Sequence, residues 1–317
     1  MTGFAFVFPG QGSQSVGMLD AWGDHPVVRD TLREASDALG EDVGALIHDG
    51  PKEALALTTN TQPVMLVAAV AAWRAWQAEA GGLRPLALAG HSLGEYSALV
   101  AAGALTLAQA APLVRLRAQA MQDAVPVGQG GMAAVLGLPA EQVVAVCAEV
   151  TAGFGDASAE TVEAVNFNDP GQTVIAGSKA AVDRACAALK AAGAKRALPL
   201  PVSAPFHSSL MKPAAERLRA HLETVEFAAP AIPVVNNIDV AAATDPAAIR
   251  DALYRQAFGP VRWVECVQAL AARGATHLVE CGPGKVLSGL AKRIDAQLVA
   301  SSVGDPATLA ETRALLA

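Results

Sequence analysis

The sequence predicts an α/β fold in which a large subdomain with a parallel sheet carries a smaller inserted subdomain. Strand-like and helix-like segments alternate in the first third of the chain, and the same alternation returns in the last third. Such alternation is typical of a parallel sheet covered by helices. The middle of the chain has a different order of segments, which indicates the insertion.

The first third begins with a short apolar run that predicts a strand over 4–8. A second apolar run predicts a strand over 86–89. Segments with helical composition precede and follow it, and Pro63 lies near the start of one of them, where proline is tolerated. The expected helices cover 26–38, 61–79, 94–102 and 107–124.

The middle third has the order β-α-β-β-α-β, which matches a ferredoxin-like unit. Gly-rich residues 128–131 precede this unit and a Pro-Leu-Pro segment at 199–201 ends it, and both resemble hinges. We therefore expect a small subdomain at 127–201 and a large one at 1–126 and 202–317. The expected strands are 132–136, 161–167, 173–176 and 196–200, and the expected helices are 140–150 and 179–192.

The last third returns to alternating helices and short apolar strands. A Cys-Gly-Pro-Gly-Lys loop at 281–285 follows its second strand. Helices are expected over 211–224, 246–258, 261–273 and 286–293, and strands over 234–237 and 276–280.

Composition excludes several classes of protein. The 317 residues are 52% hydrophobic and 17% charged, with a net charge of -7 and no long basic run, so a nucleic-acid partner is not expected. The longest apolar run, 63–73, is too short to span a bilayer, and the first residues resemble a strand more than a signal peptide. The four cysteines are scattered, so neither a zinc site nor a disulfide framework is indicated. We expect a soluble cytoplasmic protein with reduced thiols.

The Gly-His-Ser-Leu-Gly segment at Gly90–Gly94 is the strongest chemical signal. A strand precedes it and a helix follows, which is the context of a nucleophile elbow with an exposed serine, here Ser92. Glycine at both flanks avoids clashes in the bend, and the helix N-terminus faces a developing oxyanion. The large subdomain is therefore expected to be α/β-hydrolase-like. A turn with an incidental serine is the alternative, which the flanking segments disfavour.

A serine nucleophile requires a base, and His207 is the best candidate among six histidines. It lies in a loop between the small subdomain and a helix, and loops at such junctions line clefts. Its residue context alone leaves a structural role equally open. His91 lies beside the serine, and His25 and His48 lie in polar, loop-like contexts. His221 lies on a charged helix, and His277 lies in an expected strand.

The position of His207 in the chain limits the hydrolase interpretation. An α/β-hydrolase places its acid and then its histidine near the chain end, whereas several elements follow His207 here. A lipase or esterase is therefore disfavoured.

Arg117 lies on a mostly apolar helix, and a guanidinium facing an interior cleft would bind an anion such as a carboxylate. Spacing alone favours solvent exposure of both Arg115 and Arg117.

Taken together, the motifs resemble one family along nearly the whole chain. The chain is similar to the malonyl-CoA:acyl carrier protein transacylases of type II fatty acid synthesis, and to acyltransferase domains of polyketide synthases. The matching segments are Phe8–Gln14, Thr61–Pro63, Gly90–Tyr96, Val165–Asn168, Pro205–Ser208, Val235–Asn237 and Glu280–Lys285.

The resemblance implies a role for each matching position. Ser92 would be the acylated nucleophile and His207 its base and later its acid, with the backbone carbonyl of Gln256 holding the imidazole in place of an aspartate. The backbone N–H groups of Gln11 and Leu93 would form the oxyanion hole. Arg117 would bind the malonyl carboxylate, which reverses the preference from spacing. Gln62 and Asn166 lie in matching motifs, and the resemblance gives them no defined role.

The resemblance also implies the substrates. Malonyl-CoA would donate its acyl group to the pantetheine thiol of acyl carrier protein, with no metal or redox cofactor, in a protein expected to be a monomer. Carrier proteins of this pathway are acidic, so docking requires a local basic patch. The candidate clusters are Lys190, Lys195 and Arg196, or Lys285, Lys292 and Arg293. A polyketide acyltransferase, a serine hydrolase and a non-catalytic scaffold remain as alternatives.

Overall fold

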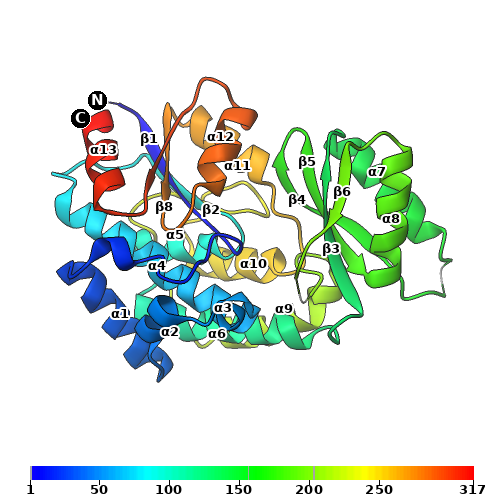
Figure 1. The fold of residues 1–317 in the computed structure, drawn as a ribbon, viewed down its shortest axis with the longest axis horizontal. Helices are drawn as coiled ribbons and strands as arrows, with labels where there is room; N and C mark the ends of the chain where they lie inside the picture. Colours follow the sequence, from blue (N-terminus) through cyan, green and yellow to red (C-terminus); the bar gives the residue numbers. More distant parts are fainter. Residues whose placement is uncertain (1, 156, 203) are drawn as a thin grey trace.

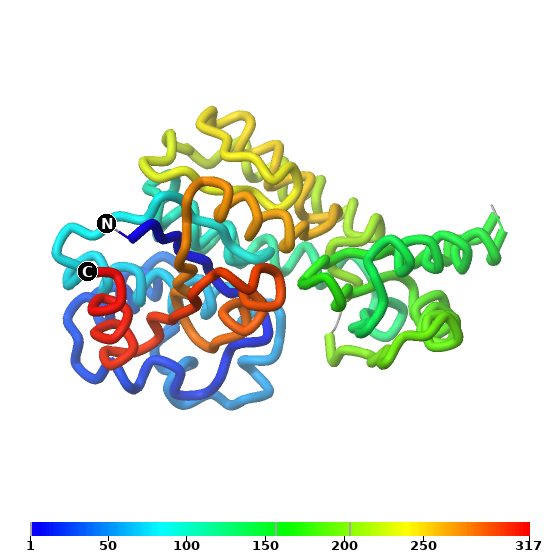
Figure 2. Tube along the Cα trace, turned by 90° about the horizontal axis from the view of Figure 1, so that it is seen from above, coloured from blue at the N-terminus to red at the C-terminus, as the bar shows by residue number. Residues whose placement is uncertain are grey.

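The computed structural model describes residues 2–155, 157–202 and 204–317. The chain forms a large α/β part and a smaller lobe beside it (Figure 1). A view from above shows the lobe, built from the middle of the chain, projecting from one side of the large part (Figure 2). Both chain termini lie together on the large part, far from the lobe.

A five-stranded sheet with the order β7-β2-β1-β8-β9 forms the centre of the large part. Every pair of neighbouring strands is parallel, as predicted. All five residues of β1 are buried because helices cover both faces of the sheet. The strands are β1 (Phe4–Phe8), β2 (Ala87–Gly90), β7 (Val234–Val235), β8 (His277–Cys281) and β9 (Val299–Val303).

The longest helix, α4, is buried continuously from Thr61 to Trp73. Its tryptophans Trp73 and Trp76 each meet Phe6 of β1 edge-on at 5.2 Å between ring centroids, which fixes the helix on the sheet. The helices of this part are α1 (Pro26–Leu39), α2 (Val43–Asp49), α3 (Lys52–Ala56), α4 (Thr58–Glu79), α5 (Gly94–Ala101), α6 (Leu107–Asp123), α9 (Lys212–Leu222), α10 (Pro246–Gln256), α11 (Trp263–Ala272), α12 (Val286–Ile294) and α13 (Pro306–Leu316).

The smaller lobe has an antiparallel sheet with the order β4-β5-β3-β6. Together with its two helices this gives the predicted β-α-β-β-α-β order, and the lobe has an apolar core of its own. The limits set at 127 and 201 stay a prediction. The elements are β3 (Gly130–Leu136), α7 (Ala140–Ala152), β4 (Val162–Asp169), β5 (Gln172–Ser178), α8 (Lys179–Ala191) and β6 (Arg196–Pro199).

Several elements were not predicted, namely α2, α3, β9 and α13. The strand β9 is half polar, and it is defined by its pairing along β8, which periodicity does not reveal. The strand expected over 234–237 stops after Val235, because the Asn236 side chain accepts the N–H of Asp239 at 2.7 Å and forms a turn.

The two parts meet through backbone hydrogen bonds. Val261 of the large part donates its N–H to Val165 O at 2.8 Å and accepts the Phe167 N–H at 3.0 Å. Near this bridge, Asn168 of β4 contacts His91, which directly follows β2, at 2.8 Å. No helix in the described part of the chain has the length and apolarity required to cross a membrane.

Candidate active site

The segment Gly90–Gly94 forms the sharp turn between β2 and α5. Ser92 has a φ of 52°, in the left-handed region that a non-glycine residue rarely adopts. A Cβ added at Gly90 would lie 1.9 Å from the Gly94 carbonyl, and one at Gly94 would lie 2.1 Å from Phe8 O. Close approach of three backbone segments therefore requires glycine on both sides of the serine.

The side chain of Asn237 holds this strained turn. Its Oδ1 accepts the Ser92 N–H at 2.7 Å, and its Nδ2 donates to Gly90 O at 2.7 Å. Strained residues at functional sites persist where the surrounding structure fixes them. Asn237 follows β7, so the neighbouring strand supplies the support for the elbow.

Ser92 and His207 are in hydrogen-bond contact. The distance from Ser92 Oγ to His207 Nε2 is 2.6 Å, and the distance from His207 Nδ1 to Gln256 O is 2.9 Å. A carbonyl can only accept, so Nδ1 carries the hydrogen and Nε2 is free to accept the serine proton. The geometry is that of a serine activated by a neighbouring base.

The imidazole of His207 is strongly biased toward its neutral form. Burial is the main cause, and the nearby positive charge of Arg117 adds to it; together they lower the pKa of His207 to about 3. At neutral pH this histidine is therefore unprotonated and able to act as a base.

Arg117 is buried, with only 2% of its surface exposed, so the preference for solvent exposure from spacing alone is wrong for it. Its Nη2 donates to Ser92 Oγ and to Gln256 Oε1, both at 3.2 Å, and its Nη1 donates to Gln62 Oε1 at 2.5 Å. Arg115 is half buried and pairs with Glu41. A charged fork beside a nucleophile is suited to binding a carboxylate.

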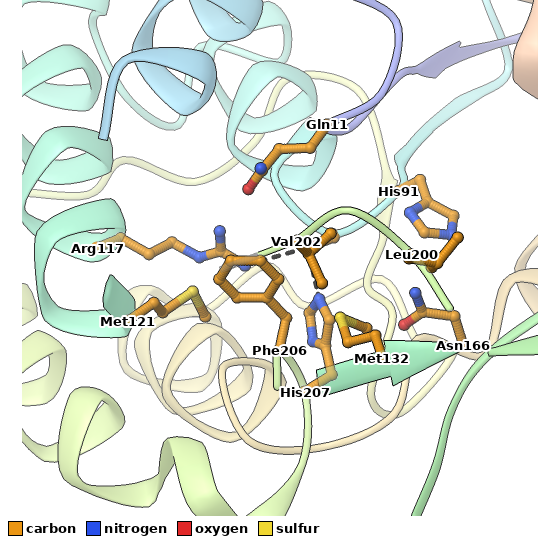
Figure 3. A pocket seen from close by; sticks show the side chains of 11 residues that line it. Gln11, His91, Arg117, Met121, Met132, Asn166, Leu200, Val202, Phe206 and His207 are labelled. Carbon is orange, nitrogen blue, oxygen red and sulfur yellow. Dashed lines mark hydrogen bonds between the residues drawn. The ribbon is translucent and has the colours of Figure 1, made fainter. Parts of the chain in front are cut away.

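A pocket of about 130 Å³ opens over these groups. In Figure 3, Gln11, Arg117 and His207 point into the same space, and His91 and Asn166 lie across it from Arg117. The walls are mostly apolar, which suits a short acyl chain. The lining residues are Gln11, His91, Ser92, Arg117, Met121, Met132, Asn166, Leu200, Val202, Phe206 and His207.

The residues expected to form the oxyanion hole flank the serine. Gln11 follows β1, whose neighbour is β2, and Leu93 is adjacent to Ser92 at the start of α5. Among the described residues neither backbone N–H has a hydrogen-bond partner. The Gln11 side chain is held separately, since its Oε1 accepts from Thr58 at 2.8 Å. The role of the Gln11 and Leu93 backbone N–H groups in binding an oxyanion stays a prediction.

The other histidines have separate environments. His91 contacts Asn168 Oδ1 at 2.8 Å, and burial lowers its pKa. His48 lies in α2, so its assignment to a loop is wrong, and His277 begins β8 and is only half buried. His25 precedes α1 and pairs with Glu79, and His221 lies half buried on α9.

Two residues of the site had no expected role beyond their motif. Glu95 is buried on α5, and burial raises the pKa of its carboxyl to about 7. Asn237 supports the elbow from a neighbouring strand. The sequence feature that could have drawn attention to Glu95 is its position as a charged residue in an apolar helix. No cluster of metal-ligating side chains occurs among the residues that the structure describes.

The chain matches one family of known proteins along most of its length. The acyl transferase domain matches residues 5–303, nearly the whole chain. The chain belongs to the acyl transferase family. This acyl transferase is 56% identical, over 98% of both chains, to the malonyl CoA-acyl carrier protein transacylase of Salmonella typhimurium.

Solved structures of two related proteins resemble this chain over almost its whole length. The acyl-carrier-protein S-malonyltransferase of Burkholderia pseudomallei is 66% identical to this acyl transferase, with a TM-score of 0.95 over 99% of this chain and 100% of that one. A malonyl-transacylase solved in complex with a type II PKS acyl-carrier protein is 52% identical, with a TM-score of 0.95 over 99% of this chain and 100% of that one.

Proposed function

We propose that the protein transfers the malonyl group of malonyl-CoA to the pantetheine thiol of acyl carrier protein, through a malonyl ester on Ser92. This activity would supply extender units for fatty acid synthesis. The relatives carry this activity in their names. The observation that carries the proposal is the buried Arg117 guanidinium, 3.2 Å from Ser92 Oγ.

In the first half-reaction Ser92 Oγ attacks the thioester carbonyl while His207 Nε2 takes its proton. The negative charge then falls on the carbonyl oxygen, which the Gln11 and Leu93 N–H groups would stabilise. When the C–S bond breaks, coenzyme A leaves as the thiol with the proton from His207. Arg117 would bind the free carboxylate of the malonyl group during this step.

In the second half-reaction the carrier-protein thiol attacks the serine ester. His207 accepts the thiol proton and returns it to Ser92 Oγ as the new thioester forms. Every bond and proton in both steps is accounted for by the two substrates and these side chains. We therefore propose that the enzyme requires no metal or redox cofactor.

The proposal is tested by intact-protein mass spectrometry after mixing with malonyl-CoA. The wild-type chain should gain one malonyl group and lose it on addition of thiol-bearing carrier protein. Ser92→Ala should gain none. Persistence of the adduct on this variant would exclude Ser92 as the nucleophile.

Service to a polyketide synthase is a second candidate, supported by the likeness to the malonyl-transacylase that was solved with a type II PKS acyl-carrier protein. Parallel assays with fatty-acid and polyketide carrier proteins separate the two functions. Hydrolysis of the serine ester by water is a further alternative. The ratio of malonyl-carrier protein to free malonate, measured in one reaction, distinguishes transfer from hydrolysis.

We also propose a cytoplasmic, monomeric enzyme without nucleic-acid or membrane partners. All four cysteines are buried and free, which suits a reducing compartment. Light scattering on a sizing column tests the monomer, and a mass of two chains would contradict it.

A further inference from the structure

The buried carboxylate of Glu95 lies next to the catalytic groups without contacting the pocket. Only 2% of the residue is exposed. Its Oε2 accepts two hydrogen bonds, from the Asn237 N–H at 2.9 Å and from Gln256 Nε2 at 2.8 Å. Burial of a carboxylate is costly, so its retention here calls for a role.

The Gln256 side chain connects this carboxylate to the arginine. Its Nε2 donates to Glu95 Oε2 and to Ser92 O, the latter at 3.0 Å. Its Oε1 accepts from Arg117 Nη2 at 3.2 Å. Glu95 Oε2 is an acceptor because it also receives the Asn237 N–H, and Ser92 O is a carbonyl. Since Arg117 only donates, the amide has one permitted orientation.

A flipped amide would place an NH2 group against the guanidinium. Two donors would then face each other in a buried site, which is unfavourable. The acceptor at Glu95, together with Ser92 O, therefore opposes rotation of the amide, and the amide oxygen keeps Arg117 beside Ser92. The backbone carbonyl of Gln256 is a separate contact, to His207, and does not depend on the side-chain orientation.

We propose that Glu95 is a positioning residue for acyl selectivity, which fixes the Gln256 amide so that Arg117 stays in place to bind an acyl carboxylate. The inference rests on the proposed function, because it concerns how the malonyl group is distinguished from an uncharged acyl group. Glu95 acts through Gln256 and touches no reacting atom.

The test measures the rate at which Ser92 is acylated by malonyl-CoA and by acetyl-CoA, followed by mass spectrometry. Glu95→Met removes the acceptor at nearly constant volume, and the malonyl-to-acetyl ratio of kcat/KM should fall about tenfold or more. Glu95→Gln keeps a carbonyl acceptor at the same place, and its ratio should stay within about threefold of wild type. Equal losses for both acyl groups in Glu95→Met would overturn the proposal.

A second variant keeps the test decisive if Glu95→Met does not fold. Gln256→Met removes the amide and retains the backbone carbonyl, so it should lower the ratio to the same extent as Glu95→Met. Combining both substitutions should cause no further loss, since the two residues act in series. A wild-type ratio in Gln256→Met would contradict the inference.

Glu280 provides a matched control. It is also a buried carboxylate, and it accepts the Ser288 N–H of α12 at 2.8 Å. Glu280→Met should lower stability and leave the malonyl-to-acetyl ratio unchanged. Absence of malonylation in the wild-type chain would reject the proposed function, whereas normal malonylation with insensitive Glu95 variants would reject only this inference.

Discussion

At the scale of single residues, the site is organised around the guanidinium of Arg117. Its two terminal nitrogens contact Gln62, Ser92 and Gln256. Its Nε has no hydrogen-bond partner among the described residues, although it is buried. The nitrogen that faces the serine is Nη2, so a substrate carboxylate would approach the guanidinium from that side.

Replacing Arg117 should change selectivity more than overall reactivity. Arg117→Ala removes a charge-assisted contact worth about 2–3 kcal/mol, so malonyl transfer should fall roughly 30- to 150-fold relative to acetyl transfer. Arg117→Lys keeps the charge without the planar fork and should recover only part of this loss. Rates measured with both thioesters check the prediction, and parallel losses for the two acyl groups would contradict it.

The neutral state of His207 predicts a particular pH dependence. With a pKa of about 3, the imidazole stays unprotonated far below neutrality, so protonation of this base should not slow serine acylation between pH 5 and 8. An unperturbed histidine would lose activity below pH 6.5. Single-turnover acylation of wild type and Glu95→Gln should follow the same flat profile. A drop centred near pH 6.5 in both would contradict the assignment.

At the scale of elements, the elbow depends on contact between the end of β1, the end of β2 and the start of α5. The glycines at 90 and 94 permit this approach, and Asn237 after β7 fixes it. Helix α6 adds Arg117 from its buried face, which also carries Leu107, Val114 and Met121. These five elements thus converge on one serine.

The steric argument for the elbow can be tested with glycine substitutions. Gly94→Ala places a Cβ 2.1 Å from Phe8 O, so unfolding free energy should fall by about 3 kcal/mol or more. Gly289→Ala in α12 meets nothing within 4 Å and should raise it by about 0.5–1 kcal/mol. Urea denaturation measures both. A Gly94→Ala chain as stable as wild type would refute the packing argument.

At the scale of the whole molecule, exposed basic residues occur on the lobe and on α12, whereas the net charge is -7. Arg293 of the second cluster pairs with Asp169 at 2.9 Å. Among the described residues no ion pair engages Lys190, Lys195 or Arg196. The lobe cluster is therefore the better candidate for an acidic partner.

Charge reversal tests this docking surface. Lys195→Glu with Arg196→Glu should raise KM for the carrier protein about five- to tenfold at low salt, with little change in KM for malonyl-CoA. The effect should diminish as salt screens the charges. Arg29→Glu on α1, at the opposite end of the molecule in Figure 1, is the matched control. Equal KM values for the double variant and the control would remove the lobe as a docking surface.

The sequence by itself determined whatever depends on neighbouring residues. The elbow lies within five consecutive residues, and the order of strands and helices in the lobe follows from local periodicity. The pairing of Ser92 with His207 and the carbonyl role of Gln256 were expected only through the family resemblance. The structure brings these groups together.

Only the tertiary structure decided where Arg117 points and what Glu95 contacts. Arg117 is 139 residues from Gln256 along the chain, and Glu95 is 161 residues from it. Contacts over such separations depend on how helices pack on the sheet, which no local pattern encodes. The stripe of buried positions on α6 carries Arg117 inward, but whether a buried guanidinium is tolerated depends on acceptors from other elements.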